Sequence, residues 1–280
     1  MRIQDITIAL SDATSSKILD MLDRNGICLI RKYIGSDDLL KLDSDFQSIF
    51  NYESGTVNIS NHPRNLDGMV ARLKLDTSKD KVLGVYQVFK SQLMENVSKE
   101  YFGGNGINLN EDVFFTKEFE SSDDILPWHF DRQQSLKFYM NLVDVDESNE
   151  AFEYDVGSHR EELFRANCYI LKGLPLGDIP NDIPFVEVRC PLRIAADAGD
   201  LVIFDPDGFH KAGTIQPGKC RKVIRGYTHP KPNHTYKAKP LDCYWWVQSC
   251  FNISKLSSNK AGRILPEKRL TSSVLTRLYK

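Results

Sequence analysis

The sequence changes character at about residue 105, and this change is the strongest constraint on its fold. Before it, apolar residues recur at helical spacing, and we expect helices over 15–25, from 36 to about 50, and over about 79–101. A short apolar run at 27–30 indicates a buried strand between the first two helices. After residue 105, short β-rich runs follow one another, separated by glycine, proline, asparagine and aspartate. These runs cover 113–119, 136–145, 151–156, 185–188, 201–204 and 221–228.

This order of elements predicts a single α+β domain over residues 1–280 with a mainly β core. Several short strands after a helical start favour an antiparallel sandwich or barrel that helices support. We expect helical support over 1–105, the β core over about 106–250 and a C-terminal extension over 251–280. The turn-rich segment 51–75 and the proline-rich insertion 171–192 are expected to be irregular loops that cover a site.

The composition argues against several functional classes. The 36 basic residues nearly balance the 38 acidic ones, so the chain lacks the positive charge of a general nucleic-acid binder. It contains no apolar stretch long enough to span a membrane and no secretory signal at its start. Its six cysteines include no C-x-x-C pair, which is typical of reduced thiols. We therefore expect a cytoplasmic protein without nucleic-acid or membrane partners. No sequence feature indicates its oligomeric state.

Three residues form a candidate metal site. His129 and Asp131 are two residues apart, and in an extended strand such residues point to the same face, so both can reach one ion. His210, at the edge of the expected strand 201–204, adds a second imidazole. Two neutral imidazoles and one carboxylate suit Fe(II) and leave coordination positions open for a bidentate cosubstrate and dioxygen. Alone the pattern is weak, since strand histidines usually have structural roles.

Two arginines extend this candidate site. Arg221 lies eleven residues after His210, and we expect it to open a strand that a hairpin folds back beside the histidine. A guanidinium can bind a carboxylate with two parallel hydrogen bonds. Strand alternation places Arg225 on the same face as Arg221, and arginines inside a barrel need anionic partners. For Arg225 the partner is either an anionic group of the substrate or a nearby carboxylate of the chain.

In this order and spacing, the motifs resemble the phytanoyl-CoA dioxygenase-like branch of the Fe(II)/2-oxoglutarate-dependent oxygenases. The resemblance spans roughly residues 15–230 and rests on 129–131, 142–144, 149–150, 156–159, 199–201, 210 and 221–222. The chain departs from the family at Glu150 and Val156, where glycine and proline are usual. It also has Ala212 where a serine often assists in binding the cosubstrate.

The resemblance implies a double-stranded β-helix, a jelly-roll or cupin-like barrel, with supporting N-terminal helices. It implies that His129, Asp131 and His210 bind the iron and that Arg221 binds the distal carboxylate of 2-oxoglutarate, with Tyr139 and Thr214 beside the cosubstrate. Substrate contacts are expected from Arg225, Trp128, Phe130, Phe152 and His159, although a histidine in a turn like that of His159 is more often structural.

The activity that the resemblance implies is oxidation of a small-molecule metabolite, in the first place hydroxylation, with release of succinate and carbon dioxide. Natural-product biosynthesis is one setting for such an enzyme. Its cofactors are Fe(II), 2-oxoglutarate and dioxygen, and we expect ascorbate to stimulate it. Asp131 argues against halogenation, because related halogenases have glycine or alanine at that position.

Two other functions remain open. The first is a cupin-like metal-dependent hydrolase or isomerase that does not use 2-oxoglutarate, but such an enzyme has no evident use for Arg221. The second is a non-catalytic binding module of the same fold. The complete set of His129, Asp131 and His210 argues against it.

Overall fold

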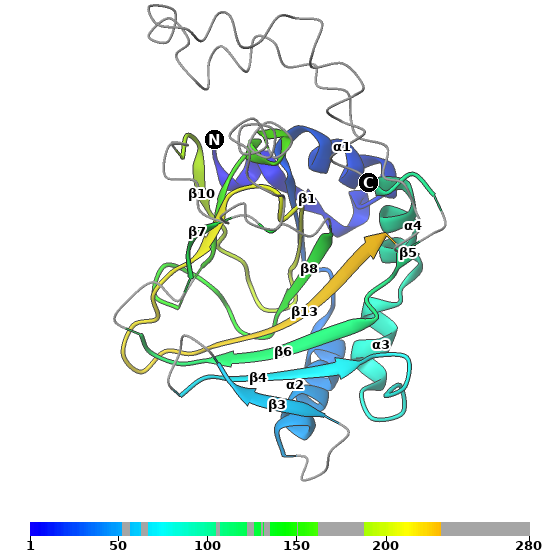
Figure 1. Cartoon of the computed structure of the whole chain (residues 1–280), viewed down its shortest axis with the longest axis vertical. Helices are drawn as coiled ribbons and strands as arrows, with labels where there is room; N and C mark the ends of the chain where they lie inside the picture. The colour runs from blue at the N-terminus through cyan, green and yellow to red at the C-terminus, as the bar shows by residue number, and fades with distance from the viewer. Residues whose placement is uncertain are drawn as a thin grey trace, which may run out of the picture.

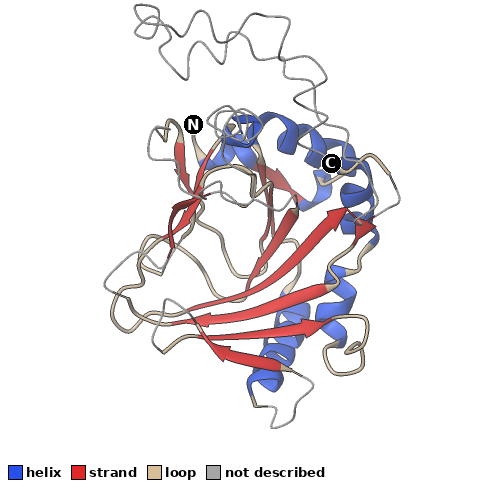
Figure 2. Cartoon of the chain, viewed as in Figure 1, coloured by secondary structure: helices blue, strands red, loops and turns tan. Residues whose placement is uncertain are grey.

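The computed structural model describes nine stretches of the chain: residues 1–51, 57–62, 67–104, 107–121, 126–129, 131, 135–149, 151–161 and 188–230. The expected strand 185–188 apart from its last residue, most of the insertion 171–192, and the extension 251–280 lie outside these residues, as does Phe130. Within them, strands form two sheets and helices flank the larger sheet (Figures 1 and 2).

The larger sheet has the strand order β1-β2-β11-β8-β13-β6-β4-β3, and β5 also pairs with β13. All of its pairs are antiparallel except β1 with β2. In chain order its strands are β1 Thr7–Ala9, β2 Ile27–Arg31, β3 Asn58–Asn61, β4 Met69–Lys74, β5 Ile107–Asn108, β6 Asp112–Glu118, β8 Leu136–Asn141, β11 Leu201–Phe204 and β13 Arg221–Pro230.

The smaller sheet has the order β10-β9-β12-β7 and is antiparallel throughout. Its strands are β7 Leu126–His129, β9 Glu153–Asp155, β10 Pro191–Arg193 and β12 His210–Ala212. Most of the predicted β runs that the structure describes are confirmed as strands, while β10 forms at the end of the predicted irregular insertion.

The helices are α1 Ser15–Asn25, α2 Ser36–Phe50, α3 Leu83–Phe89 and α4 Gln92–Tyr101, with short 3-10 turns at η1 Ile3–Ile6, η2 Leu10–Asp12 and η3 Ser158–Glu161. The side chain of Thr14 caps α1 by accepting a hydrogen bond from the Lys17 backbone, and Gly26 ends it in the left-handed conformation with φ of 76°. The predicted bounds of α1 and α2 are confirmed, although Gly35 rather than Ser36 is the N-cap of α2.

Two predictions for the first hundred residues are wrong. The single helix expected over 79–101 is two helices, because Ser91 has extended backbone (φ −64°, ψ 151°) and starts α4 anew. The segment 51–75, expected to be a loop, contains β3 and β4. Buried Ala71 and Leu73 alternate there with exposed Arg72 and Lys74, so one face of β4 packs on the core and the other meets solvent.

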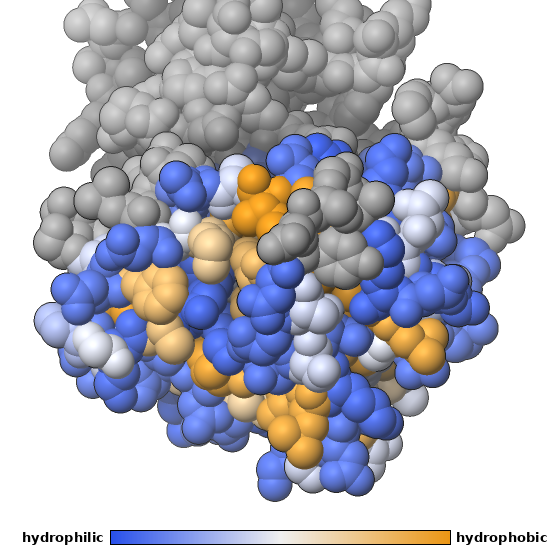
Figure 3. All heavy atoms as spheres, turned by 90° about the horizontal axis from the view of Figure 1, so that it is seen from below, coloured by the Kyte–Doolittle hydropathy of each residue, from blue (hydrophilic) through white to orange (hydrophobic). Residues whose placement is uncertain are grey.

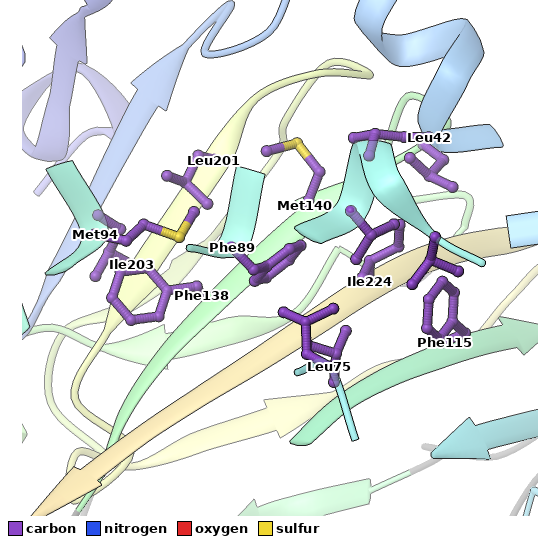
Figure 4. Close-up of a cluster of buried hydrophobic side chains, with 14 of the residues drawn as sticks. Leu42, Leu75, Phe89, Met94, Phe115, Phe138, Met140, Leu201, Ile203 and Ile224 are labelled. Carbon is purple, nitrogen blue, oxygen red and sulfur yellow. The ribbon is translucent and has the colours of Figure 1, made fainter. Parts of the chain in front are cut away.

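Strand alternation divides the apolar residues between two cores. On β8, Phe138 and Met140 join the core under the helices, while Tyr139 joins the core between the two sheets. Figure 4 shows part of the first core, where residues from β6, β8, β11 and β13 meet residues from the helices. The second core contains Val202, Phe204 and Val223 of the larger sheet and Phe152 and Tyr154 from the smaller side. The space between the sheets is therefore the interior of the predicted barrel.

The carboxylate of Asp200 connects the N-terminal strand β2 to this barrel. It is fully buried, accepts hydrogen bonds from the backbone nitrogens of Lys32 (2.7 Å) and Asp197 (2.8 Å), and pairs with Arg31 at 2.5 Å. A buried carboxylate is tolerated where such partners replace its water. Asp200 therefore fixes the turn that leads into β11.

The face in Figure 3 is mostly hydrophilic, with hydrophobic side chains in separate patches, as on ordinary protein surfaces. None of the described helices combines the length and apolar character of a membrane span. Cys28, Cys190 and Cys220, the cysteines among the described residues, are free, and burial raises the pKa of Cys28 to about 12.

Candidate active site

The smaller sheet brings the three predicted metal ligands together. His210 on β12 pairs in register with His129 on β7, and their ring centroids are 4.2 Å apart. Asp131 follows β7, and its backbone nitrogen donates a hydrogen bond to Pro206 O at 2.8 Å. The Asp131 Oδ1 atom lies 3.9 Å from Nε2 of each histidine. One ligand atom from each residue lies within 4.8 Å of the other two.

The two carboxylate-to-imidazole distances are compatible with a shared metal ion. Ligand atoms that are each about 2.1 Å from one ion lie at most ~4.2 Å apart, and the two carboxylate-to-imidazole distances satisfy this limit. The donor set of two imidazoles and one carboxylate is that of mononuclear Fe(II) sites with open positions. His129 and Asp131 are partly exposed, with 12% and 28% of their side-chain surface accessible, so an ion and a ligand can reach them.

The second oxygen of the Asp131 carboxylate pairs with Lys137. Lys137 Nζ lies 2.6 Å from Asp131 Oδ2 and is buried beneath it on β8. Burial alone would lower the pKa of Lys137, but Tyr139 and Asp131 raise it above its usual value, so it stays protonated. Burial likewise would raise the pKa of Asp131, but Lys137 and the histidines lower it. Lys137 thus keeps the carboxylate ionised, a role that the sequence analysis missed.

His210 is held ready to bind through Nε2. Its Nδ1 lies 2.8 Å from Gly208 O, and a carbonyl oxygen can only accept, so Nδ1 carries the proton. Burial, and then the charges of Lys137 and His129, lower the pKa of His210 to about 3. A neutral ring with its proton on Nδ1 has its Nε2 lone pair free for a metal.

Arg221 lies on the opposite wall of the barrel from His210. The predicted hairpin beside the histidine is wrong, because β12 pairs with β7 and β9 while β13 pairs with β6 and β8. The chain crosses from one sheet to the other over residues 213–220. The predicted placement of Arg221 and Arg225 on one face is consistent with Val223 between them, which packs in the interior core.

Arg221 already has an anionic partner in Glu118, which the sequence analysis did not identify. Its Nε and Nη2 lie 2.7 and 2.6 Å from Glu118 Oε2, and both side chains are buried. His62 Nε2 lies 3.1 Å from the other carboxylate oxygen. Burial would raise the pKa of Glu118, but Arg221, His62 and Arg225 together lower it to about 2.

The cross-strand register orders the interior residues in rows. Tyr227, Lys137 and Phe204 form the row nearest the metal ligands, since Lys137 contacts Asp131. The next row is Phe114, Arg225, Tyr139 and Val202, followed by Thr116, Val223 and Asn141, and then by Glu118 and Arg221. Rows on one face are ~6.6 Å apart along the strands. Arg225 therefore lies between the metal ligands and Arg221.

The remaining predicted residues divide into two groups. Tyr139 and Phe152 pack inside the barrel against Phe204, with ring centroids 4.9 and 5.0 Å from its ring. Trp128 is half-buried beside the metal ligands on β7. Thr214, by contrast, is exposed after β12, and the buried hydroxyl near Arg221 is that of Thr116, which has no hydrogen-bond partner. His159 lies 3.2 Å from Asp23 O at the end of α1, which is a structural position.

Comparison with known proteins gives likenesses of structure only. No family model matches the chain, and no curated protein is similar to it in sequence. The epimerase SnoN, solved with Fe3+, alpha ketoglutarate and nogalamycin RO, has a TM-score of 0.58 and 13% identity over 82% of this chain and 88% of its own. The alpha ketoglutarate dependent carbocyclase SnoK has a TM-score of 0.56 and 13% identity over 84% and 92%.

The protein AviO1 from Streptomyces viridochromogenes Tue57 has a TM-score of 0.53 and 15% identity over 79% of this chain and 96% of its own. This chain has the double-stranded β-helix fold of these proteins. The predicted fold class is thereby confirmed. The narrower resemblance to the phytanoyl-CoA dioxygenase-like branch stays a prediction.

Proposed function

We propose that this protein is an Fe(II)- and 2-oxoglutarate-dependent enzyme that oxidises a small-molecule metabolite. The observation that carries the proposal is the convergence of His129, Asp131 and His210 at the interior of a barrel that also contains two arginines. The similar solved structures support it, because SnoN was solved with iron and alpha ketoglutarate, and HygX from Streptomyces hygroscopicus with nickel and 2-oxoglutarate.

Each interior residue has a distinct role in this proposal. Nε2 of both histidines and Oδ1 of Asp131 hold the metal, while Lys137 fixes the second carboxylate oxygen. Arg221 holds the distal carboxylate of 2-oxoglutarate and shares its guanidinium with Glu118. When bound, iron and 2-oxoglutarate supply the oxidation of the substrate by dioxygen, with release of succinate and carbon dioxide.

Hydroxylation is the first candidate reaction, as the sequence resemblance implies. Epimerisation or ring closure is the second, and the likeness to the epimerase SnoN and the carbocyclase SnoK favours it. All three outcomes use the same metal and cosubstrate. Mass spectrometry of the product separates them, because hydroxylation adds an oxygen atom whereas epimerisation leaves the mass unchanged.

Metal binding is the first experiment. Titration calorimetry with Fe(II) under anaerobic conditions should give one site per chain. His129→Ala, Asp131→Ala and His210→Ala should each lose it and remain folded. The matched control is His229→Ala, which removes a half-buried histidine of β13 that contacts Asn108. Wild-type affinity in any of the three ligand variants would show that the site is misassigned.

Cosubstrate binding is the second experiment. Losing one partner of a desolvated ion pair costs ~2–5 kcal/mol. Arg221→Ala should therefore weaken 2-oxoglutarate binding about 30- to 4,000-fold without removing iron. Arg221→Lys should recover part of this loss, since a point charge cannot make two parallel bonds. The exposed Arg193→Ala serves as the control, because Arg193 pairs on the surface with Glu147 and Glu153.

Arg221→Ala also leaves Glu118 buried without its partner, so reduced folding could imitate reduced binding. The double variant Arg221→Met, Glu118→Met removes both charges and resolves this ambiguity. It should fold and bind iron but fail to bind 2-oxoglutarate. A wild-type protein that binds iron but not 2-oxoglutarate would favour the hydrolase or isomerase instead. One that binds neither would favour a binding module.

A further inference from the structure

Arg225 differs from the other interior cations in having no carboxylate of its own. Arg221 pairs with Glu118, and Lys137 pairs with Asp131. Among the residues that the structure describes, no carboxylate forms an ion pair with Arg225, and its Nε is buried without a hydrogen-bond partner. The Arg225 side chain does make a hydrogen bond to Tyr139, and its charge also acts on Glu118. Its Nε is nevertheless an unsatisfied buried donor, which is costly unless a ligand supplies an acceptor.

Two aromatic rings flank the Arg225 guanidinium. The guanidinium carbon lies 5.9 Å from the ring centres of Phe114 and of Tyr139. Phe114 and Arg225 itself are half-buried, unlike the fully buried Val223 on the same face. Part of this row is therefore open to solvent. An aromatic frame around a guanidinium restricts its orientation and leaves its remaining N–H groups for an acceptor.

The balance of charges inside the barrel also favours an anionic ligand at Arg225. Inside the barrel, the described cations Arg221, Arg225 and Lys137 are opposed by the carboxylates of Glu118 and Asp131, which leaves one positive charge. Ferrous iron would add two positive charges and 2-oxoglutarate would remove two. Among the described residues, one uncompensated positive charge would thus remain in the loaded site, and Arg225 is the cation without a paired carboxylate.

We propose that Arg225 binds an anionic group of the substrate, such as a carboxylate, sulfonate or phosphate. This inference rests on the proposed function and adds a substrate class to it. Arg225 is one row from Lys137, about 6.6 Å along the strands, whereas Arg221 is three rows away. Arg225 is therefore nearer than Arg221 to the candidate metal ligands.

The test uses small anions in place of the unidentified substrate. Zn(II)-loaded protein with saturating 2-oxoglutarate, which cannot turn over, is titrated calorimetrically with methanesulfonate, inorganic phosphate and acetate. At least one should bind saturably. Arg225→Gln should weaken that binding at least 30-fold, and Arg225→Lys should restore part of it. Neutral dimethyl sulfone, matched to methanesulfonate in shape, should not compete.

The control variant is Arg72→Gln, which removes an exposed arginine from the same row, where Arg72 pairs with Phe114. It should leave anion binding unchanged. The affinity for 2-oxoglutarate, measured in the same variants, should change less than threefold in Arg225→Gln. If Arg225→Gln instead weakens 2-oxoglutarate as strongly as Arg221→Ala, Arg225 is a cosubstrate residue and the inference is wrong.

Failure of the proposed function gives a different pattern. If wild-type protein binds neither metal nor 2-oxoglutarate, a thermal shift of the metal-free protein with the same anions still measures the Arg225 site. A shift that Arg225→Gln abolishes then supports the anion site without the oxygenase. Absence of anion binding in both forms, or binding that persists in Arg225→Gln, overturns the inference.

Discussion

Lys137 Nζ lies 2.6 Å from Asp131 Oδ2, while Oδ1 of the same carboxylate is 3.9 Å from Nε2 of both His129 and His210. Oδ2 of Asp131 thus contacts Lys137, while Oδ1 faces the two histidines. Residues that orient a metal ligand in this way commonly affect metal affinity almost as strongly as the ligand itself. Lys137 is therefore a positioning residue of the candidate metal site.

Replacing Lys137 with methionine should lower metal affinity by about 10- to 100-fold, because Asp131 loses the contact that orients it. Lys137→Arg should recover part of the affinity by restoring a cation. Competition between Fe(II) and a chromophoric chelator measures the change. Lys74→Met, on an exposed position of β4, is the control. Unchanged or tighter metal binding in Lys137→Met would contradict a positioning role.

Glu118→Gln should destabilise the protein at pH 7 by about 3–5 kcal/mol, because it leaves the buried Arg221 without its anion. The carboxyl pKa falls from 4.5 to about 2 on folding, so its contribution is complete above pH 5 and is lost as the pH falls towards 2. Urea unfolding at several pH values should therefore show the wild type and the variant converging in acid.

The control for this pH dependence is Glu100→Gln, which neutralises an exposed glutamate near the end of α4. Its stability should stay within about 0.5 kcal/mol of wild type at every pH, as is usual for surface substitutions. A difference between Glu118→Gln and wild type that stays constant down to pH 2 would show that the ion pair is not the cause.

Gly208→Ala should disturb the distal histidine. A Cβ atom at this position would lie 2.0 Å from the Tyr154 hydroxyl oxygen, and Gly208 O accepts the hydrogen bond from His210 Nδ1. We expect a loss of about 1–3 kcal/mol in unfolding free energy from overpacking, together with weaker metal binding. Gly213→Ala meets no atom within 4 Å and should change neither quantity. Equal stability and equal metal affinity of the two variants would contradict the close contact between Gly208 and Tyr154.

Asp200→Asn should lower stability without changing metal affinity in the folded protein. The amide cannot accept from both backbone nitrogens and Arg31 at once, so about 1–3 kcal/mol should be lost. Denaturant unfolding measures the first quantity and calorimetry the second. Asp197→Asn, a 71% exposed neighbour of Arg31, should have little effect on either. Loss of metal binding in folded Asp200→Asn would contradict this prediction and show that Asp200 also affects the metal site.

Sequence reasoning selected the three residues of the candidate metal site because strand alternation relates His129 to Asp131, and because His210 follows a predicted strand. It also predicted α1 closely, since Thr14 and Gly26 are strong local signals for the start and end of a helix. Local periodicity places side chains on faces, and this is enough to put Arg221 and Arg225 together.

Pairing between distant strands is not local, and there the sequence reasoning failed. Nothing near Arg221 indicates that Glu118, on another strand, becomes its partner. The same holds for Lys137, whose ion pair with Asp131 depends on the packing of two sheets. The turn after β12 looks like a hairpin in the sequence. Whether β13 then pairs with β12 or joins the other sheet depends on burial across the whole barrel.

The crossing between His210 and Arg221 has a consequence for stability. A molecule that contacted His210 on one wall and Arg221 on the other would bridge the two sheets. Such a molecule would bind the folded barrel and not the unfolded chain, so it would raise the apparent stability of the protein.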